Sequence, residues 1–161
     1  MRHSTLRTWV QARVESVVPD KDPATDWQYV DDVSSLGTKI TRGHLRHYDL
    51  RWGESSPNWI DGTKAPHRLA TIRQGEIRIL YPVARNRLSD VEDMACDDAD
   101  LVVAALKDSA NRLTETSDGA HARTQAQHTG LERRGADTET SVLVTIQVQI
   151  EHRRKRSPLG A

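Results

Sequence analysis

The stretch SVLVTIQVQIE, residues 141–151, decides the fold, because apolar side chains occupy every second position within it. Successive side chains of a β-strand point to opposite faces of a sheet, so strict alternation predicts a strand with one buried face. The intervening positions are mostly polar, and we expect that second face to meet water or another chain. The apolar positions are Val142, Val144, Ile146, Val148 and Ile150.

A long helix is predicted before this strand, from Ser89 to Leu113. The sequence SDVE at residues 89–92 has the form of a capping box, in which the first and fourth side chains bond to backbone amides of the first turn. Apolar residues then recur at the helical period, interrupted by Asp98 and Ser109. The apolar positions of this stripe are Val91, Met94, Ala95, Leu101, Val102, Ala105, Leu106, Ala110 and Leu113.

Nearer the N-terminus, Ser4 is positioned to cap a helix that runs to about Val18 and ends at Pro19. Its buried stripe would consist of Leu6, Val10, Val14 and Val17.

Two strand regions occupy the middle of the chain. The first is predicted over residues 38–52, with alternate residues on one face from Tyr48 to Trp52. The second, residues 67–84, is predicted as one bent strand or a hairpin, with a bulge or turn at Gln74-Gly75. Pro82 cannot donate to a ladder, which suggests that this end lies at a sheet edge.

These elements predict a single α+β domain over residues 1–153. Its mixed, mainly antiparallel sheet would carry two amphipathic helices packed mainly on one face, with a basic tail over residues 154–161. Polar connections without a period span residues 20–37, 53–66 and 114–140, and we expect the last to be an extended arm or loop. Long connections in a compact domain usually bind a ligand or a partner, and these have the composition of arms.

Composition limits the classes of function. The 161 residues include 36% hydrophobic residues and no phenylalanine, which is little material for an isolated core, so neighbouring chains are expected to add stability. Lys plus Arg and Asp plus Glu both total 23, so no net charge attracts nucleic acid or membrane. The single cysteine, Cys96, excludes an intramolecular disulfide and is expected to be a buried small residue. No apolar run is long enough for a membrane span, and MRHSTLRTWV at residues 1–10 lacks a secretory apolar segment, so we expect synthesis in a cytoplasm.

Two groups of residues have side chains that could bind a catalytic metal ion. His44, His47 and Asp49 suggest a metal site, but positions 44 and 47 of a strand point to opposite faces. Four acidic residues at three- and four-residue spacing on the long helix form a row that could bind magnesium, which we call the acidic row: Asp90, Asp93, Asp97 and Asp100. Carboxylates near a helix N-terminus more often form a solvated or docking surface. The sequence contains no glycine-rich phosphate loop and no HExxH motif. We therefore expect no enzyme activity, no cofactor and no metal site, and a metal-dependent nuclease is the least favoured alternative.

Candidate interface residues come from three features. The first is the acidic row, the second is a pair of tryptophans predicted in loops, where they would either fold back or anchor a partner, and the third is the basic run EHRRKR at residues 151–156. The basic run could contact DNA or an acidic protein, or remain a solvated tail. The candidate residues are Asp90, Asp93, Asp97, Asp100, Trp27, Trp59, Arg153, Arg154, Lys155 and Arg156.

The order of elements adds a family resemblance. An N-terminal helix precedes strands that end in EIRILYPVARN (76–86), the helix LSDVEDMACDDADLVVAALKD (88–108), a polar segment and VLVTIQVQIEHRR (142–154). This layout resembles the tail terminator proteins of long-tailed bacteriophages, also called tail-completion or minor tail proteins. The resemblance is clearest over residues 76–113 and 142–153.

The resemblance implies a structural virion protein that forms a hexameric ring on the head-proximal end of the tail tube. Such a ring stops tube polymerisation and presents a surface to the head-completion complex. The implied partners are copies of the chain, the major tail tube protein and a head-completion or neck protein, with passing contact to DNA in the lumen. A head-completion or neck connector ring is the first alternative, and an unrelated bacterial oligomeric binding module is the next. Our own inference is that the acidic helix face and the basic run form a head-to-tail pair of patches between copies.

Overall fold

In the computed structural model, the chain forms one layer of strands with two α-helices packed on one side. The described residues are 3–21, 27–36, 46–59, 68–83, 87–108, 114–115, 120–135 and 140–155. Their elements are α1 (His3–Glu15), β1 (Trp27–Tyr29), the 3₁₀ helix η1 (Val33–Ser35), β2 (Arg46–Trp59), β3 (Arg68–Pro82), α2 (Leu88–Lys107), β4 (Thr114–Glu115), β5 (Ala120–Arg134) and β6 (Ser141–Lys155).

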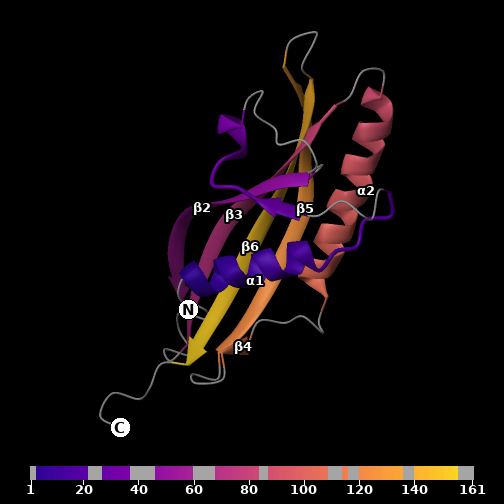
Figure 1. The fold of residues 1–161 in the computed structure, drawn as a ribbon. Coiled ribbons are helices and arrows are strands. Elements are labelled where there is room, and N and C mark those ends of the chain that lie inside the picture. The colour runs from indigo at the N-terminus through magenta and orange to yellow at the C-terminus, as the bar shows by residue number, and fades with distance from the viewer. Residues whose placement is uncertain are drawn as a thin grey trace, which may run out of the picture.

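The strands form one sheet in the order β1-β2-β3-β6-β5-β4, in which β1 runs parallel to β2 and every other pair is antiparallel. Figure 1 shows α1 lying across the strands, whereas α2 runs beside β5. Both helices contribute to one buried cluster with the sheet, so the predicted α+β class, with helices on one face, is confirmed. None of the described helices is long and apolar enough to cross a membrane.

The last strand is central, as its alternation predicts. β6 pairs with β3 along one side and with β5 along the other. Its five alternating apolar residues, from Val142 to Ile150, are at most 3% exposed and face the helices. Leu143 points the other way and is also buried, in a second small cluster with Val33 and Leu80. β6 therefore has apolar neighbours on both faces at one end of the sheet.

The predicted stripe of α1 is confirmed, because Leu6, Val10, Val14 and Val17 are all buried in the core. The predicted cap is wrong. The helix already includes His3, and Ser4 lies inside it, where its carbonyl accepts a hydrogen bond from the Thr8 hydroxyl at 3.0 Å. The helix ends at Glu15, a little before the predicted end.

The predicted stripe of α2 is confirmed at Val91, Met94, Ala95, Val102 and Leu106, which are buried. Leu101 and Ala105 are only partly buried, and Ala99, which was not predicted, is buried. The predicted boundaries of the helix are wrong. The helix begins at Leu88, one residue before the predicted capping box, and its N-cap residue Arg87 makes no side-chain cap bond. The Glu92 carboxylate instead accepts from the Arg133 guanidinium of β5 at 2.5 Å. The helix ends at Lys107, and residues 109–113, including Ala110 and Leu113, lie outside the described residues.

The prediction of an extended polar arm or loop over residues 114–140 is wrong. Residues 120–134 form β5, a full strand of the sheet, and residues 114–115 form β4. The inward positions of β5 include Thr124 and Ala126, which are too small or too polar to reveal the strand period by hydrophobicity. The sheet consequently takes up much of the chain that the sequence assigned to a loop.

Other boundaries also change. The loop predicted over residues 20–37 contains β1 and η1, and Trp27 packs edge-on against Tyr48. The connection predicted over residues 53–66 begins only after Trp59, because β2 continues through a bulge between Trp52 and Ser55. That bulge lies opposite the Gln74-Gly75 site where we predicted one in β3.

The ends of β3 and β6 need two further corrections. β3 is a single interior strand, so Pro82 lies beside Ser141 of β6 and not at a sheet edge. Pro82 is the last residue of β3. β6 extends to Lys155, so Arg154 and Lys155 belong to the sheet, and the predicted tail retains only residues 156–161, which lie outside the described residues.

Gly75 provides a test of the packing at the bulge. A Cβ at this position would lie 2.7 Å from the Trp52 ring and 2.9 Å from the Arg51 carbonyl oxygen. We expect Gly75→Ala to lower the free energy of unfolding by about 1–3 kcal/mol through overpacking, as measured by urea denaturation. Gly130→Ala is the control, because its Cβ would meet only Thr145 at 3.9 Å. Equal stability of the two variants would contradict this packing.

Candidate functional site

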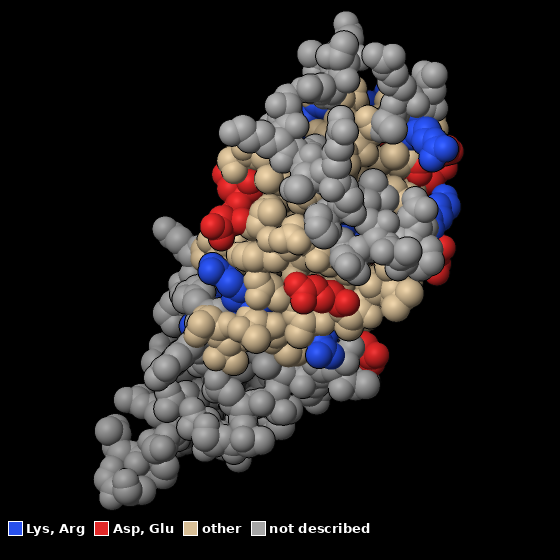
Figure 2. Space-filling view, in the orientation of Figure 1, with Lys and Arg blue, Asp and Glu red and all other residues tan. Residues whose placement is uncertain are grey.

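The sheet face turned away from the helices, which we call the outer face, carries most of the polar side chains that the structure brings together. It holds alternate residues of the four long strands, since side chains of a strand alternate between faces. Figure 2, in the orientation of Figure 1, shows acidic and basic groups of the described residues interspersed among uncharged ones. The hydrogen-bonded polar cluster and the groove described below lie on the outer face, which makes it the candidate site.

A buried ion pair anchors one end of the outer face. Asp49 of β2 and Arg78 of β3 lie directly opposite each other and are 0% and 6% exposed. The Arg78 Nε donates to the Asp49 Oδ1 at 3.0 Å, and its Nη2 donates to the Oδ2. The Asp49 Oδ2 also accepts from the Val33 backbone amide at 2.9 Å. The pair is thus hydrogen-bonded on both oxygens, as a buried carboxylate requires.

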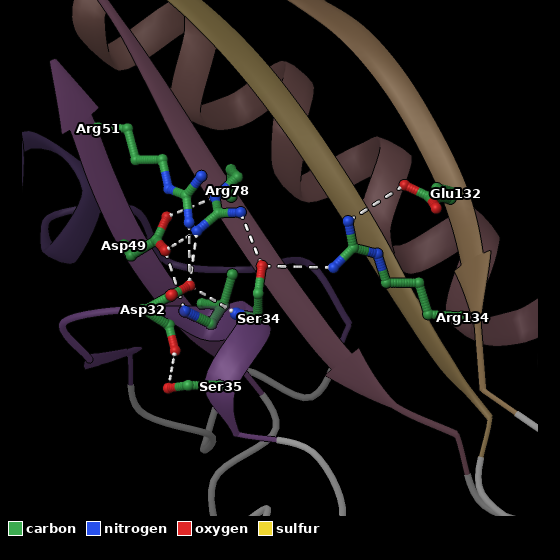
Figure 3. Close-up of polar contacts among 9 residues, drawn as sticks. Asp32, Ser34, Ser35, Asp49, Arg51, Arg78, Glu132 and Arg134 are labelled. Atoms are coloured by element: carbon green, nitrogen blue, oxygen red, sulfur yellow. Dashed lines mark hydrogen bonds and ion pairs between the residues drawn. The ribbon is translucent and has the colours of Figure 1, made fainter. Parts of the chain in front are cut away.

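The same arginine connects η1 to the sheet (Figure 3). Arg78 donates to the Ser34 hydroxyl at 2.8 Å and to Asp32 at 2.9 Å, while Arg51 donates to Asp32 at 3.2 Å. Arg134 of β5 donates to the same hydroxyl at 3.4 Å. The Ser34 backbone amide and the Arg78 guanidinium hold the pKa of Asp32 below its ordinary value. This cluster balances its charges internally, so it fixes η1 and does not attract an ion.

A second buried pair lies on the opposite face, between β2 and α2. The Arg46 Nε donates to the Asp98 Oδ2 at 2.5 Å, and the Tyr81 hydroxyl donates to the same oxygen at 2.9 Å. Arg46 also donates to the Lys21 carbonyl at 2.7 Å and lies over the Trp27 ring. Burial raises the pKa of Asp98, against the opposing effect of Arg46. Asp98, an interruption in the apolar stripe, therefore provides a buried polar link between α2 and the sheet.

Further along the outer face, a groove of about 450 Å³ crosses β2, β3, β6 and β5. Its floor follows the backbone of the register row Trp52, Gly75, Val148 and Ala126. The side chains of Trp52, Val148 and Ala126 face the helices. The neighbouring positions on each strand project to the outer face and form the two walls. One wall is formed by Arg51, Glu76, Gln147 and Gln127, and the other by Gln74, Gln149 and Gln125.

The acidic row lies on α2, away from the outer face. Asp90, Asp93, Asp97 and Asp100 are all exposed, and the Asp97 carboxylate is 3.5 Å from the Lys21 ammonium. Burial, and then the neighbouring carboxylates, raise the pKa of the half-buried Cys96 thiol, so this thiol is poorly reactive. Within the described ranges, no group of three or more His, Cys, Asp or Glu residues could hold a metal ion.

The structure does not bring the other candidate interface residues together with the acidic row. Trp27 belongs to β1 and is half-buried, and its indole N–H donates to the Val17 carbonyl at 3.0 Å, so it is folded back. The backbone of Trp59 lies in β2, and the backbones of Arg153, Arg154 and Lys155 lie in β6. The side chains of these four residues are not among those that the structure describes. Arg156 and His44 lie outside the described residues.

The groove was missed by sequence reasoning, although a signal was present. Five of the seven glutamines of the chain line it. Four of them come from the segments QAQ (125–127) and QVQ (147–149), in which two glutamines flank an apolar residue. That spacing places both amides of each segment on one face of a strand. The signal could not be used without the register that aligns the two segments.

No family model matches the chain, and no curated protein matches it. A solved structure is similar over 93% of this chain and 96% of its own length, at 12% identity and a TM-score of 0.45. That degree of similarity carries no conclusion about family or function.

The buried pair of the outer face predicts a measurable stability difference. Asp49→Asn leaves the Arg78 guanidinium without its main buried partner, and we expect it to lower the free energy of unfolding by about 3 kcal/mol. The matched control is Glu92→Gln, which removes an exposed bond to Arg133 and should cost much less. Urea denaturation of both variants measures the difference. A loss at Glu92 as large as that at Asp49 would refute the anchoring role of the buried pair.

Proposed function

We propose that this chain is a tail terminator protein of a long-tailed bacteriophage. In this role it forms a hexameric ring on the head-proximal end of the tail tube, stops tube polymerisation and provides the surface that joins the head-completion complex. The observation that carries the proposal is the pair of uncovered sheet edges described next. The family resemblance of the sequence supports the same role, and its virion location follows from it.

The edges of the sheet are covered for only a short distance. β1 pairs with β2 from Arg46 to Tyr48, and β4 pairs with β5 from Ala120 to His121. Among the described residues, β2 from Leu50 to Trp59 and β5 from Ala122 to Arg134 therefore have a strand neighbour on one side only. Uncovered edges expose backbone donors and acceptors, and they are sites where another chain can pair.

The two edges are complementary in direction. β2, β3, β6 and β5 alternate in direction along the sheet, so β5 of one copy would meet β2 of the next in an antiparallel pair. A contact between two different edges is head-to-tail, and such contacts close into a ring when the rotation between successive copies closes. Pro57 and the bulge after Trp52 shorten the pairing that β2 can offer, and this limits uncontrolled aggregation.

The acidic row supports a second contact between copies. α2 presents its exposed carboxylates beside β5, at the edge that would meet the next copy. In this proposal they attract the basic segment 153–156 of a neighbour. The attraction steers assembly and weakens at high salt.

Charge reversal tests this contact. We expect Asp93→Lys together with Asp97→Lys to prevent ring assembly, because both positions are exposed and the change inverts the charge of the row. Analytical ultracentrifugation measures the assembled fraction. The control variant combines Asp20→Lys with Asp31→Lys, which makes the same change of charge at exposed positions off α2. Unchanged assembly of the α2 variant would remove the acidic row from the interface.

Infection with the gene disrupted tests the function itself. Loss of a terminator is expected to give tails of uncontrolled length, seen by electron microscopy, and the intact gene supplied in trans should restore normal tails. Normal-length tails that remain unattached to heads would instead identify a neck connector ring. Normal, infectious particles would contradict both roles.

A further inference from the structure

The groove on the outer face has the chemistry of a peptide-binding site. We propose that it binds an extended polypeptide segment that carries a lysine or arginine side chain. This inference goes beyond the proposed terminator role. It concerns the single chain and holds whether or not copies form a ring, so each proposal can fail without the other.

The uncharged amides of the groove are suited to a peptide backbone. A glutamine side chain offers two N–H donors and one carbonyl acceptor, which match the carbonyl and amide groups of an extended chain. Within the part of the chain that the structure describes, no hydrogen bond is assigned to the side chains of Gln125, Gln127, Gln147 or Gln149. Their bonding capacity is therefore available to a ligand that displaces water.

The charges of the groove select among ligands. Among the described residues that line the groove, Arg51 is the one cationic side chain, and it is already paired with Asp32. A nucleic-acid backbone needs several cations to neutralise its phosphates, so the groove is poorly suited to it. Glu76 is exposed and, among the described residues, has no ion-pair partner. The unbalanced carboxylate favours a cationic group on the bound segment.

The dimensions of the groove fit a single extended chain. Its two walls are formed by positions two residues apart on each strand, which are about 7 Å from each other. Adjacent strands lie about 4.8 Å apart, so the four strands give a length of about 14 Å, enough for about four extended residues. A chain in this position would cross the strands, with Glu76 near the middle of its path.

Nuclear magnetic resonance of the full chain tests the proposal through the glutamine side-chain amide signals. The probe is the capped peptide GSTKTS, titrated to about 10 mM, which would nearly saturate a site with a 1 mM Kd. We expect shifts at Gln125, Gln127, Gln147 and Gln149. Affinity for this peptide should exceed that for GSTETS by about two- to fivefold, the size expected of an exposed charge pair.

Two variants and one other ligand complete the test. Glu76→Gln should remove the preference for the lysine peptide, whereas Glu132→Gln, on the same face but outside the groove, should keep it. The proposal is overturned if the groove glutamines do not shift. It is also overturned if maltohexaose shifts them equally, which would indicate a carbohydrate site, or if Glu76→Gln leaves the preference intact.

Discussion

Burial of β6 is the constraint on which the rest of the structure depends. This strand is paired along both sides and is covered on its inner face by the two helices. At one end it is also covered on the outer face, where Leu143 meets Val33 and Leu80. A strand buried on both faces must hold its register closely, since a slip of one residue would exchange the two faces. β3 and β5 both pair with β6, so β6 sets their alignment. That alignment places QVQ (147–149) beside QAQ (125–127), and the two segments together line the groove.

Two buried ion pairs then fix what lies on each side of the sheet. β2 supplies Arg46 to the helix side and Asp49 to the outer side, three residues apart and so on opposite faces. The first pair holds α2 and the second holds η1. Buried pairs gain little net stability after desolvation, but loss of one partner is costly, so they favour one arrangement over its alternatives. The second pair holds η1 beside Asp49 and Arg78, at one end of the outer face. The groove lies further along the strands, and η1 is not part of its lining.

The sequence predicted the elements whose burial follows a simple period. The alternation in β6 and the stripe of α1 were sufficient, because large apolar residues occupy nearly every inward position. β5 could not be recognised, since its inward positions include Thr124 and Ala126, and the helix start was misplaced because Glu92 bonds to a distant strand. The exposure of the acidic row was predictable from α2 alone. The Asp49–Arg78 pair and the groove depend on cross-strand register, which no local pattern contains.

Among the described residues, the central strands β3 and β6 are paired along both sides, whereas most of β2 and β5 is paired along one side only. Hydrogen–deuterium exchange at low and high protein concentration tests this difference most directly, because it reports on backbone amides one segment at a time. We expect exchange to slow with concentration in β2 beyond Leu50 and in β5, and to be unchanged in β6 and α1. Identical exchange of β2 and β5 at both concentrations would contradict it.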